Sequence, residues 1–128
     1  MTKEPFLLSI GNNVTISTDV SFITHDNSAK LIFTDRGDLF GRISIGDNCF
    51  IGERATILYG VTLGNNVIVA AGAVVTKSFC EPNIIIGGNP ARVIGTWDDY
   101  KNKYCDNAIK RKEMIRRIKS EEKFLVQK

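Results

Sequence analysis

The sequence predicts an all-β solenoid, in which the chain winds through short stacked coils, with one loop ejected from the coils and an α-helix after them. Three observations support this fold class. An apolar residue recurs every six positions, Gly or Asn stands at many of the intervening turns, and the spacing becomes helical after Trp97. A six-residue period fits neither an α-helix nor a hairpin meander, but it fits a short strand followed by a turn. The 128 residues are enough for one small domain.

Each six-residue unit has two apolar positions. The first position holds Ile10, Ile16, Phe22, Leu39, Ile45, Ile51, Ile57, Leu63, Val69 and Val75. The fifth position holds Val14, Val20, Ile43, Cys49, Ala55, Val61, Val67, Ala73 and Phe79. We expect the first-position side chains to point inward, where each buried Ile, Leu or Val contributes about 1.5–3 kcal/mol, and the fifth-position side chains to fill the corners. Gly, Asn and Asp supply the backbone angles of these corners.

The six-residue phase is interrupted twice. Phe22 and Leu39 lie seventeen residues apart, where eighteen would keep the register, so we expect a loop of about residues 26–38 to be ejected from the solenoid. Loops that interrupt a rigid scaffold often carry function. The second interruption is Glu81-Pro82, and an apolar run at 84–86 predicts one last strand after it.

Residues 98–128 are expected to form a helical tail, separate from a repeat domain of residues 1–97. Asp98 is suited to cap the helix. The apolar side chains on or near one helical face are Tyr100, Tyr104, Ala108, Ile109, Ile115, Ile118 and Leu125. We expect this face to lie on the solenoid or on a sister subunit. Acidic residues within the polar face argue against the alternative, a helix on a membrane surface.

The net charge of +3 belongs to the tail, because residues 1–95 carry seven Lys/Arg and eight Asp/Glu, whereas residues 96–128 carry ten and six. We interpret the basic tail as a solvated helix face and expect no nucleic-acid partner. No apolar run approaches the roughly 20 residues of a membrane helix, and the first residues lack the apolar core of a signal peptide, which predicts a cytoplasmic protein without membrane insertion. The three cysteines include no CxxC pair, so the sequence suggests neither a disulfide framework nor a zinc knuckle.

Four segments besides the repeat carry a resemblance to known proteins: FITHD at 22–26, YGVTLG at 59–64, AAGAVVTK at 70–77 and GGNPARVI at 87–94. Together with the repeat, they resemble the hexapeptide-repeat acyltransferases, and within these the sugar and polysaccharide O-acetyltransferase branch related to the galactoside and maltose acetyltransferases. The resemblance covers about residues 9–95. It implies a left-handed parallel β-helix, assembled as a homotrimer with active sites between neighbouring subunits.

The resemblance further implies acetyl-CoA as the donor, a hydroxyl of a sugar or polysaccharide as the acceptor, and His25 as the general base. An alcohol attacks a thioester poorly until its proton is removed, and a positioned imidazole that takes this proton is worth about 10²–10⁴ in rate. His25 is the one histidine of the chain and lies where the ejected loop begins. Asp26 follows it and points to the opposite face of a strand, so it would hold the loop or reach the next subunit; a catalytic or orienting role stays open.

The coenzyme A groove of the family maps onto four residues of this chain. Ala71 matches the position whose backbone meets the pantetheine amides, Thr76 and Lys77 match a pair near the nucleotide, and Arg92 matches a basic residue near its phosphates. Small residues let the backbone approach the cofactor, and Lys and Arg neutralise phosphate, although both charges would also fit an ordinary solvated surface. Gly60, at a corner in the same groove, is a candidate backbone donor to the oxyanion. No metal is implied.

The acceptor is expected to contact the ejected loop. The candidate residues, whose mixed charges suit a polyhydroxylated acceptor, are Lys30, Phe33, Asp35, Arg36 and Asp38. Longer relatives carry N-terminal coils with an Asn that assists the histidine, whereas nine residues precede Ile10 here. Another group then has to supply that role, or the chain belongs to a shorter branch.

Other functions of such a repeat remain as alternatives. Within the acetyltransferases, these are N-acetylation of an amino-sugar nucleotide and acetylation of a streptogramin- or chloramphenicol-type antibiotic. A non-catalytic solenoid would show a regular flat face of Thr, but Thr15, Thr56 and Thr62 form no regular series. A γ-type carbonic anhydrase binds zinc through three histidines, which a chain with one histidine excludes.

Overall fold

The computed structural model describes residues 2–118 and 123–128, and the chain divides into two compact units, Met1–Thr96 and Trp97–Lys128. In the described part of the chain, the β-strands lie in the first unit and the α-helices lie in the second. The six-residue repeat is therefore a property of the first unit alone.

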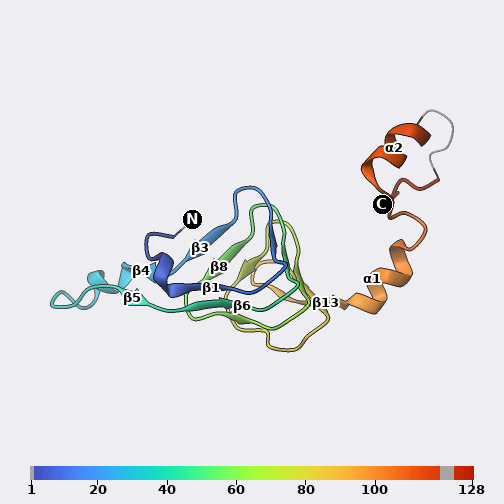
Figure 1. The fold of residues 1–128 in the computed structure, drawn as a ribbon. Coiled ribbons are helices and arrows are strands. Elements are labelled where there is room, and N and C mark those ends of the chain that lie inside the picture. The colour runs from blue at the N-terminus through green and yellow to red at the C-terminus, as the bar shows by residue number, and fades with distance from the viewer. Residues whose placement is uncertain (1, 119–122) are drawn as a thin grey trace. The chain divides into compact units, whose positions relative to one another are not determined.

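The repeat forms three parallel sheets that the chain visits in turn. The first sheet contains β1 (Leu8–Ile10), β6 (Ile43–Ile45) and β9 (Thr62–Leu63). The second contains β2 (Thr15–Ile16), β7 (Phe50–Ile51), β10 (Val67–Val69) and β12 (Ile84–Gly87), with β13 (Arg92–Thr96) added antiparallel to β12. The third contains β3 (Ser21–Ile23), β8 (Thr56–Leu58) and β11 (Val74–Val75). In Figure 1, strands from successive passes of the chain lie side by side.

The strand register has the spacing that the repeat predicts. Phe50 of β7 pairs with Ile68 of β10, eighteen residues further along the chain. Thr56 and Val74 pair over the same interval. Three six-residue units therefore make one coil, and the backbone groups of each strand find their hydrogen-bond partners in neighbouring coils. The predicted last strand at 84–86 is confirmed as part of β12, which pairs in parallel with β10.

Most residues at the two apolar positions of the repeat are buried, as the sequence predicts, and Val14 and Val20 at the fifth position are partly buried. The buried residues at these positions are Phe22, Ile43, Ile45, Cys49, Ile51, Ala55, Ile57, Val61, Leu63, Val67, Val69, Ala73, Val75 and Phe79. The coils also stack closely at their backbones: a Cβ atom at Gly64 would lie 2.4 Å from the carbonyl oxygen of Cys80. The interior of the first unit is therefore built by residues at fixed intervals along the chain.

Three first-position residues are not buried, which corrects the sequence prediction. Ile10 and Ile16 are each 39% exposed; they lie on β1 and β2, strands that have a neighbouring strand on one side only. Leu39 is 49% exposed because it lies on β5 (Leu39–Phe40), which pairs antiparallel with β4 (His25–Asp26) outside the three parallel sheets. The buried repeat therefore resumes at Ile43 rather than at Leu39.

Asparagine residues turn the chain at equivalent corners. Asn13, Asn48 and Asn66 each have a φ of 56°, in the left-handed region that Asn tolerates better than most residues. Their side chains also connect coils, because Asn13 Nδ2 donates to Asn48 Oδ1 at 3.3 Å. Likewise, Asn66 Nδ2 donates to Asn83 Oδ1 at 2.7 Å. The expected role of Asn at the corners is confirmed at these positions.

The ejected loop leaves the coils between β4 and β5. These two short strands form an antiparallel ladder, and a 3₁₀ turn, η2 (Ser28–Leu31), follows β4. Figure 1 shows the loop projecting away from the parallel sheets. A second 3₁₀ turn, η1 (Pro5–Leu7), precedes β1. His25 lies at the point where the chain leaves the coils and enters this loop.

The second unit contains two short helices, α1 (Trp97–Tyr104) and α2 (Arg111–Arg117), so the expectation of one continuous helix is wrong. The first helix ends where Cys105, Asp106 and Asn107 follow one another, and all three residue types have low helix propensity. Residues 119–122 of the expected helix lie outside the described residues.

Side-chain contacts also favour the break between the helices. Asn107 Nδ2 donates to the carbonyl oxygen of Phe124 at 2.9 Å, and the Arg117 guanidinium lies 5.0 Å from the centre of the Phe124 ring. Asp98 lies within the first turn of α1 rather than before it, which corrects its expected place as the cap. Among the described residues, no helix has the length and apolar character needed to cross a bilayer.

Candidate active site

His25 is the first residue of β4, and one residue separates it from the end of β3. The residue between these strands, Thr24, is buried, and its position fixes the backbone that leads into His25. In the β4–β5 ladder, His25 pairs with Phe40, and the two ring centroids lie 5.7 Å apart. The His25 side chain remains 28% exposed. The imidazole is therefore held by the ladder and stays accessible to a substrate.

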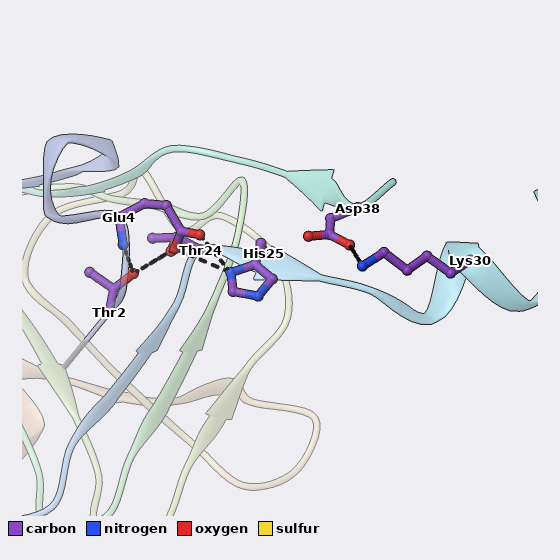
Figure 2. Close-up of polar contacts among 6 residues, drawn as sticks. All are labelled: Thr2, Glu4, Thr24, His25, Lys30 and Asp38. Carbon is purple, nitrogen blue, oxygen red and sulfur yellow. Dashed lines mark hydrogen bonds and ion pairs between the residues drawn. The ribbon is translucent and has the colours of Figure 1, made fainter. Parts of the chain in front are cut away.

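A carboxylate from the N-terminal segment reaches this imidazole. Glu4 Oε1 lies 2.9 Å from His25 Nδ1, and Glu4 Oε2 lies 3.2 Å from the same nitrogen (Figure 2). Thr24 Oγ1 donates to Glu4 Oε2 at 2.7 Å, and Thr2 Oγ1 donates to the same oxygen at 3.3 Å. The Thr2 and Thr24 hydroxyls also contact each other. Glu4 is thus surrounded by hydrogen-bond donors.

These donors determine the ionisation of Glu4. The hydrogen bond from Thr24 is the largest influence that holds the pKa of Glu4 below its ordinary value. The His25 ring and Thr2 act in the same direction, whereas desolvation opposes them. At neutral pH the Glu4 side chain is therefore an ionised carboxylate, which can only accept hydrogen bonds.

A cavity of about 270 Å³ opens beside His25. It is lined by Thr2, Lys3, Phe22, Ile23, Thr24 and His25. Its walls come from the N-terminal segment and from the end of β3, so the imidazole lies at the edge of a space that could admit a small chemical group.

The Asp26 carboxylate faces the ejected loop and the neighbouring coil. Its Oδ1 accepts a hydrogen bond from the Ser28 N–H at 2.8 Å, and the Tyr59 hydroxyl donates to its Oδ2 at 3.5 Å. The Ser28 hydrogen bond is the main cause that lowers the pKa of Asp26. Asp26 thus ties the beginning of the loop to Tyr59. The carboxylate that contacts His25 Nδ1 within this chain is that of Glu4.

The loop residues expected to meet the acceptor contact one another. Lys30 Nζ lies 3.3 Å from Asp38 Oδ1, as Figure 2 shows. Arg36 Nε lies 3.7 Å from Asp35 Oδ1, and the Arg36 guanidinium lies 4.9 Å from the centre of the Phe33 ring. The charges that the loop presents therefore come in pairs of opposite sign.

The residues expected to hold coenzyme A lie on later coils than His25. Ala71, Thr76 and Lys77 are exposed on either side of β11, and Arg92 is exposed at the start of β13. In the third sheet, β8 lies between β11 and β3, the strand that leads into His25. The expected cofactor residues and the expected base are therefore separated by at least one strand within the chain.

Gly60 does not fit the expected role of oxyanion donor. Its N–H already donates to the carbonyl oxygen of Arg42 at 3.0 Å, and its φ of 83° is one that favours glycine. An N–H engaged within the coil is not available to a reacting oxygen, so the structure makes Gly60 a turn residue.

Glu4 is the site residue that the sequence analysis missed. It precedes the first repeat and lies 21 residues before His25, so neither the period nor a motif connects the two residues. The available signal was the resemblance itself, which implied either that another group replaces the Asn of longer relatives or that the chain belongs to a shorter branch. Within the residues that the structure describes, no group of three or more His, Cys, Asp or Glu side chains could hold a metal ion.

Comparison with known proteins identifies the family. The model for the hexapeptide repeat of succinyl-transferase matches residues 42–77. The chain is 49% identical over 108 residues to protein CapG of Staphylococcus aureus, a match that covers 83% of this chain and 62% of CapG. It is 32% identical over 102 residues to galactoside O-acetyltransferase of Escherichia coli, covering 79% of this chain and 50% of that enzyme.

Among solved structures, the chain is similar to a galactoside acetyltransferase in complex with coenzyme A. The TM-score is 0.66 at 33% identity, and the match covers 74% of this chain and 48% of that chain. The chain spans 62% and 50% of the lengths of the two curated relatives. The repeat, the strand register and these relatives together show that the chain belongs to the hexapeptide-repeat family, and it is similar to acetyltransferases of the sugar O-acetyltransferase branch.

Proposed function

We propose that this chain transfers an acetyl group from acetyl-CoA to a hydroxyl of a sugar or polysaccharide acceptor, with His25 as the general base. The observation that carries the proposal is the position of the imidazole, which lies at the interruption of the repeat, beside a cavity, with Glu4 2.9 Å from Nδ1. The similarity to galactoside O-acetyltransferase and to a coenzyme A complex supports the classes of acceptor and donor.

In the proposed reaction, His25 takes the proton of the acceptor hydroxyl while its oxygen attacks the carbonyl carbon of the thioester. The tetrahedral intermediate collapses with cleavage of the C–S bond, and the imidazolium returns the proton to the departing thiolate. The products are the acetyl ester and coenzyme A, and His25 is neutral again. Such acid–base help accounts for about 10²–10⁴ of the rate.

The donor groove is assigned to Ala71, Thr76, Lys77 and Arg92. The exposed turn at Ala71 offers a backbone without a bulky side chain, which suits the pantetheine amides. Lys77 and Arg92 are exposed cations that suit the phosphates of coenzyme A. Substitution of either cation by Ala is expected to weaken coenzyme A binding. The effect should be larger for Arg92, because a guanidinium can bind a phosphate through two parallel hydrogen bonds.

The acceptor is assigned to the ejected loop, through Lys30, Phe33, Asp35 and Arg36. Phe33 and Arg36 contact each other and together offer an aromatic face and a cation to a sugar ring. Asp26 holds the base of the loop through Ser28 and Tyr59 rather than taking part in proton transfer.

The assembly is inferred to be a homotrimer of left-handed β-helices, with residues 1–97 as the acyltransferase domain and residues 98–128 as a tail. The similarity to galactoside acetyltransferase supports the hand of the coils. Since β8 separates the coil of His25 from the Ala71–Lys77 region, a donor groove completed by a neighbouring copy would bring base and thioester together. Light scattering coupled to gel filtration should then give three times the 14.2 kDa mass of the chain.

Release of free thiol from acetyl-CoA tests the activity. Hydroxyl acceptors such as simple sugars and capsular oligosaccharides are compared with amino-sugar nucleotides and with streptogramin and chloramphenicol antibiotics. We expect acceptor-dependent release with a saccharide. Release with an amino-sugar nucleotide or an antibiotic alone would replace the proposed acceptor class, and silence with every acceptor together with no coenzyme A binding would favour a non-catalytic solenoid.

A further inference from the structure

We propose that Glu4 is the positioning residue of this active site: its carboxylate fixes His25 in the tautomer that carries the proton on Nδ1 and leaves Nε2 unprotonated. The functional meaning of this inference rests on the proposed role of His25 as the base. The contact itself rests on geometry, because Glu4 Oε1 lies 2.9 Å from Nδ1. A ring nitrogen that donates to a carboxylate must carry its proton, and a neutral imidazole then has its lone pair on the other nitrogen.

Three donors converge on the one carboxylate. The Thr24 hydroxyl and the Thr2 hydroxyl donate to Oε2, and His25 Nδ1 lies closest to Oε1 (Figure 2). The Glu4 backbone N–H also donates to Thr2 Oγ1 at 3.1 Å, which ties the segment to the same cluster. A carboxylate has enough lone pairs for all these donors, whereas a neutral amide has one accepting oxygen. The cluster therefore calls for an ionised acid at position 4.

The cluster joins the N-terminal segment to the residues that set the imidazole. Thr24 is 1% exposed and precedes His25 directly, so its hydroxyl anchors Glu4 to a rigid part of the fold. The ring packs against Phe40 on its other side, through the β4–β5 ladder. Held by Glu4 at Nδ1 and packed against the tilted Phe40 ring, the imidazole has a defined orientation.

The other charged groups near the ring have different tasks. Asp26, which follows His25 on β4, accepts hydrogen bonds from Ser28 and Tyr59. Lys3 lines the cavity beside His25 and is exposed. Removal of the Glu4 carboxylate should therefore change most directly which nitrogen of the His25 ring carries the proton.

Nuclear magnetic resonance of the full-length chain tests the inference without an acceptor. Since His25 is the one histidine, long-range ¹H–¹⁵N correlation spectra report on this ring alone. We expect the wild-type neutral ring to be protonated on Nδ1. In Glu4→Gln we expect a mixture of tautomers, because the carboxylate that accepts from Nδ1 is gone.

Two further variants control the experiment. Glu81→Gln removes an exposed carboxylate near the end of the repeat and should leave the tautomer as it is in the wild type. Glu4→Asp keeps the charge and should keep the tautomer ratio closer to the wild-type value than Glu4→Gln does. Melting temperatures and acetyl-CoA affinities are compared across the variants, so that a loss of folded protein is recognised.

Turnover links the spectra to function. With acetyl-CoA and a saccharide that supports thiol release, kcat of Glu4→Gln should fall between about tenfold and 10⁴-fold, the range set by partial and complete loss of imidazole orientation. A wild-type tautomer in Glu4→Gln would overturn the inference, and so would a loss of kcat without any change in the spectra, since that pattern indicates a structural role. His25→Ala is measured in parallel: if it keeps wild-type turnover, the proposed base is wrong, and Glu4 is not a positioning residue for it whatever the spectra show.

Discussion

The coils and the ejected loop contain the same apolar residue types but bury them to opposite extents. Ile51 and Ile57 of the coils are fully buried, whereas Leu31 and Ile32 of the loop are 88% and 78% exposed. Residue type alone therefore does not decide burial in this molecule. In the coils the six-residue phase favours burial, because it stacks each apolar residue on equivalent residues of the neighbouring coils.

The buried coils and the exposed loop have different roles in the molecule. Residues that keep the phase build a rigid scaffold, and a substitution there should change the free energy of unfolding. Residues at the interruption, His25 and the loop, are free of that constraint, and a substitution there should change acetyl transfer more than stability. The first two predictions below compare a position in the coils with a matched position in the loop, and the next two concern the buried and exposed thiols and the Glu4 carboxylate.

The largest effect on stability is expected from shortening a buried side chain of the repeat. Ile57 is fully buried on β8, between β3 and β11. Ile57→Ala should lower the free energy of unfolding by about 2–5 kcal/mol, through lost burial and the cavity that remains. Ile32→Ala in the loop should change it by less than about 0.5 kcal/mol. Urea unfolding followed by circular dichroism measures both, and equal effects would contradict the distinction between coil and loop.

A second effect concerns the backbone. A Cβ atom at Gly64 would lie 2.4 Å from the Cys80 carbonyl oxygen, so Gly64→Ala must push two coils apart and should cost about 1–3 kcal/mol. A Cβ atom at Gly37 in the loop meets nothing within 4 Å, so Gly37→Ala should be neutral or slightly stabilising. Melting temperatures compare the two variants. A neutral Gly64→Ala would show that the coils yield at this contact.

A third comparison uses the cysteines. Cys49 is buried in the coils, whereas Cys80 and Cys105 are exposed. Burial raises the pKa of the Cys49 thiol, so this thiol stays protonated and unreactive in the folded protein. It becomes reactive when alkaline pH or denaturant unfolds the chain. A thiol-specific colour reagent should react quickly with two thiols in the native protein and with the third after denaturation. Rapid reaction of all three in the native state would mean that the coils open readily.

The smallest effect is expected from Glu4 at acid pH. Because the pKa of Glu4 in the folded protein lies below its usual value of 4.5, the ionised carboxylate stabilises the fold above that pH. This contribution disappears as the pH falls through the lower folded-state pKa. The stability difference between wild type and Glu4→Gln should therefore shrink on acidification, as measured by urea unfolding at several pH values. A difference that is constant with pH would indicate that the Glu4 charge does not contribute.

The coils could be predicted from the sequence because one period fixes both the strands and the buried residues. The same rule misplaced Leu39, which keeps a repeat-like residue type but lies on a ladder outside the coils. It also overestimated the burial of Ile10 and Ile16, because the period does not say which strands are at an edge. Burial in a solenoid thus depends on neighbouring coils as well as on phase.

The site was predicted in part. His25 could be chosen from the sequence because the chain has one histidine and it lies at the interruption of the repeat. Glu4 could not, since its contact with His25 joins two segments through the tertiary fold. The continuous helix after Trp97 was expected from the spacing of apolar residues, but residues 105–107 have low helix propensity, and Asn107 bonds to Phe124 instead.

Acetyl transfer by His25→Ala is the most direct test of the proposed chemistry. The measurement is the initial rate of thiol release from acetyl-CoA with a saccharide acceptor, together with the Kd for coenzyme A from calorimetry. Loss of the general base should lower turnover by about 10²–10⁴ while coenzyme A still binds. Wild-type turnover in His25→Ala would contradict the assignment of the base.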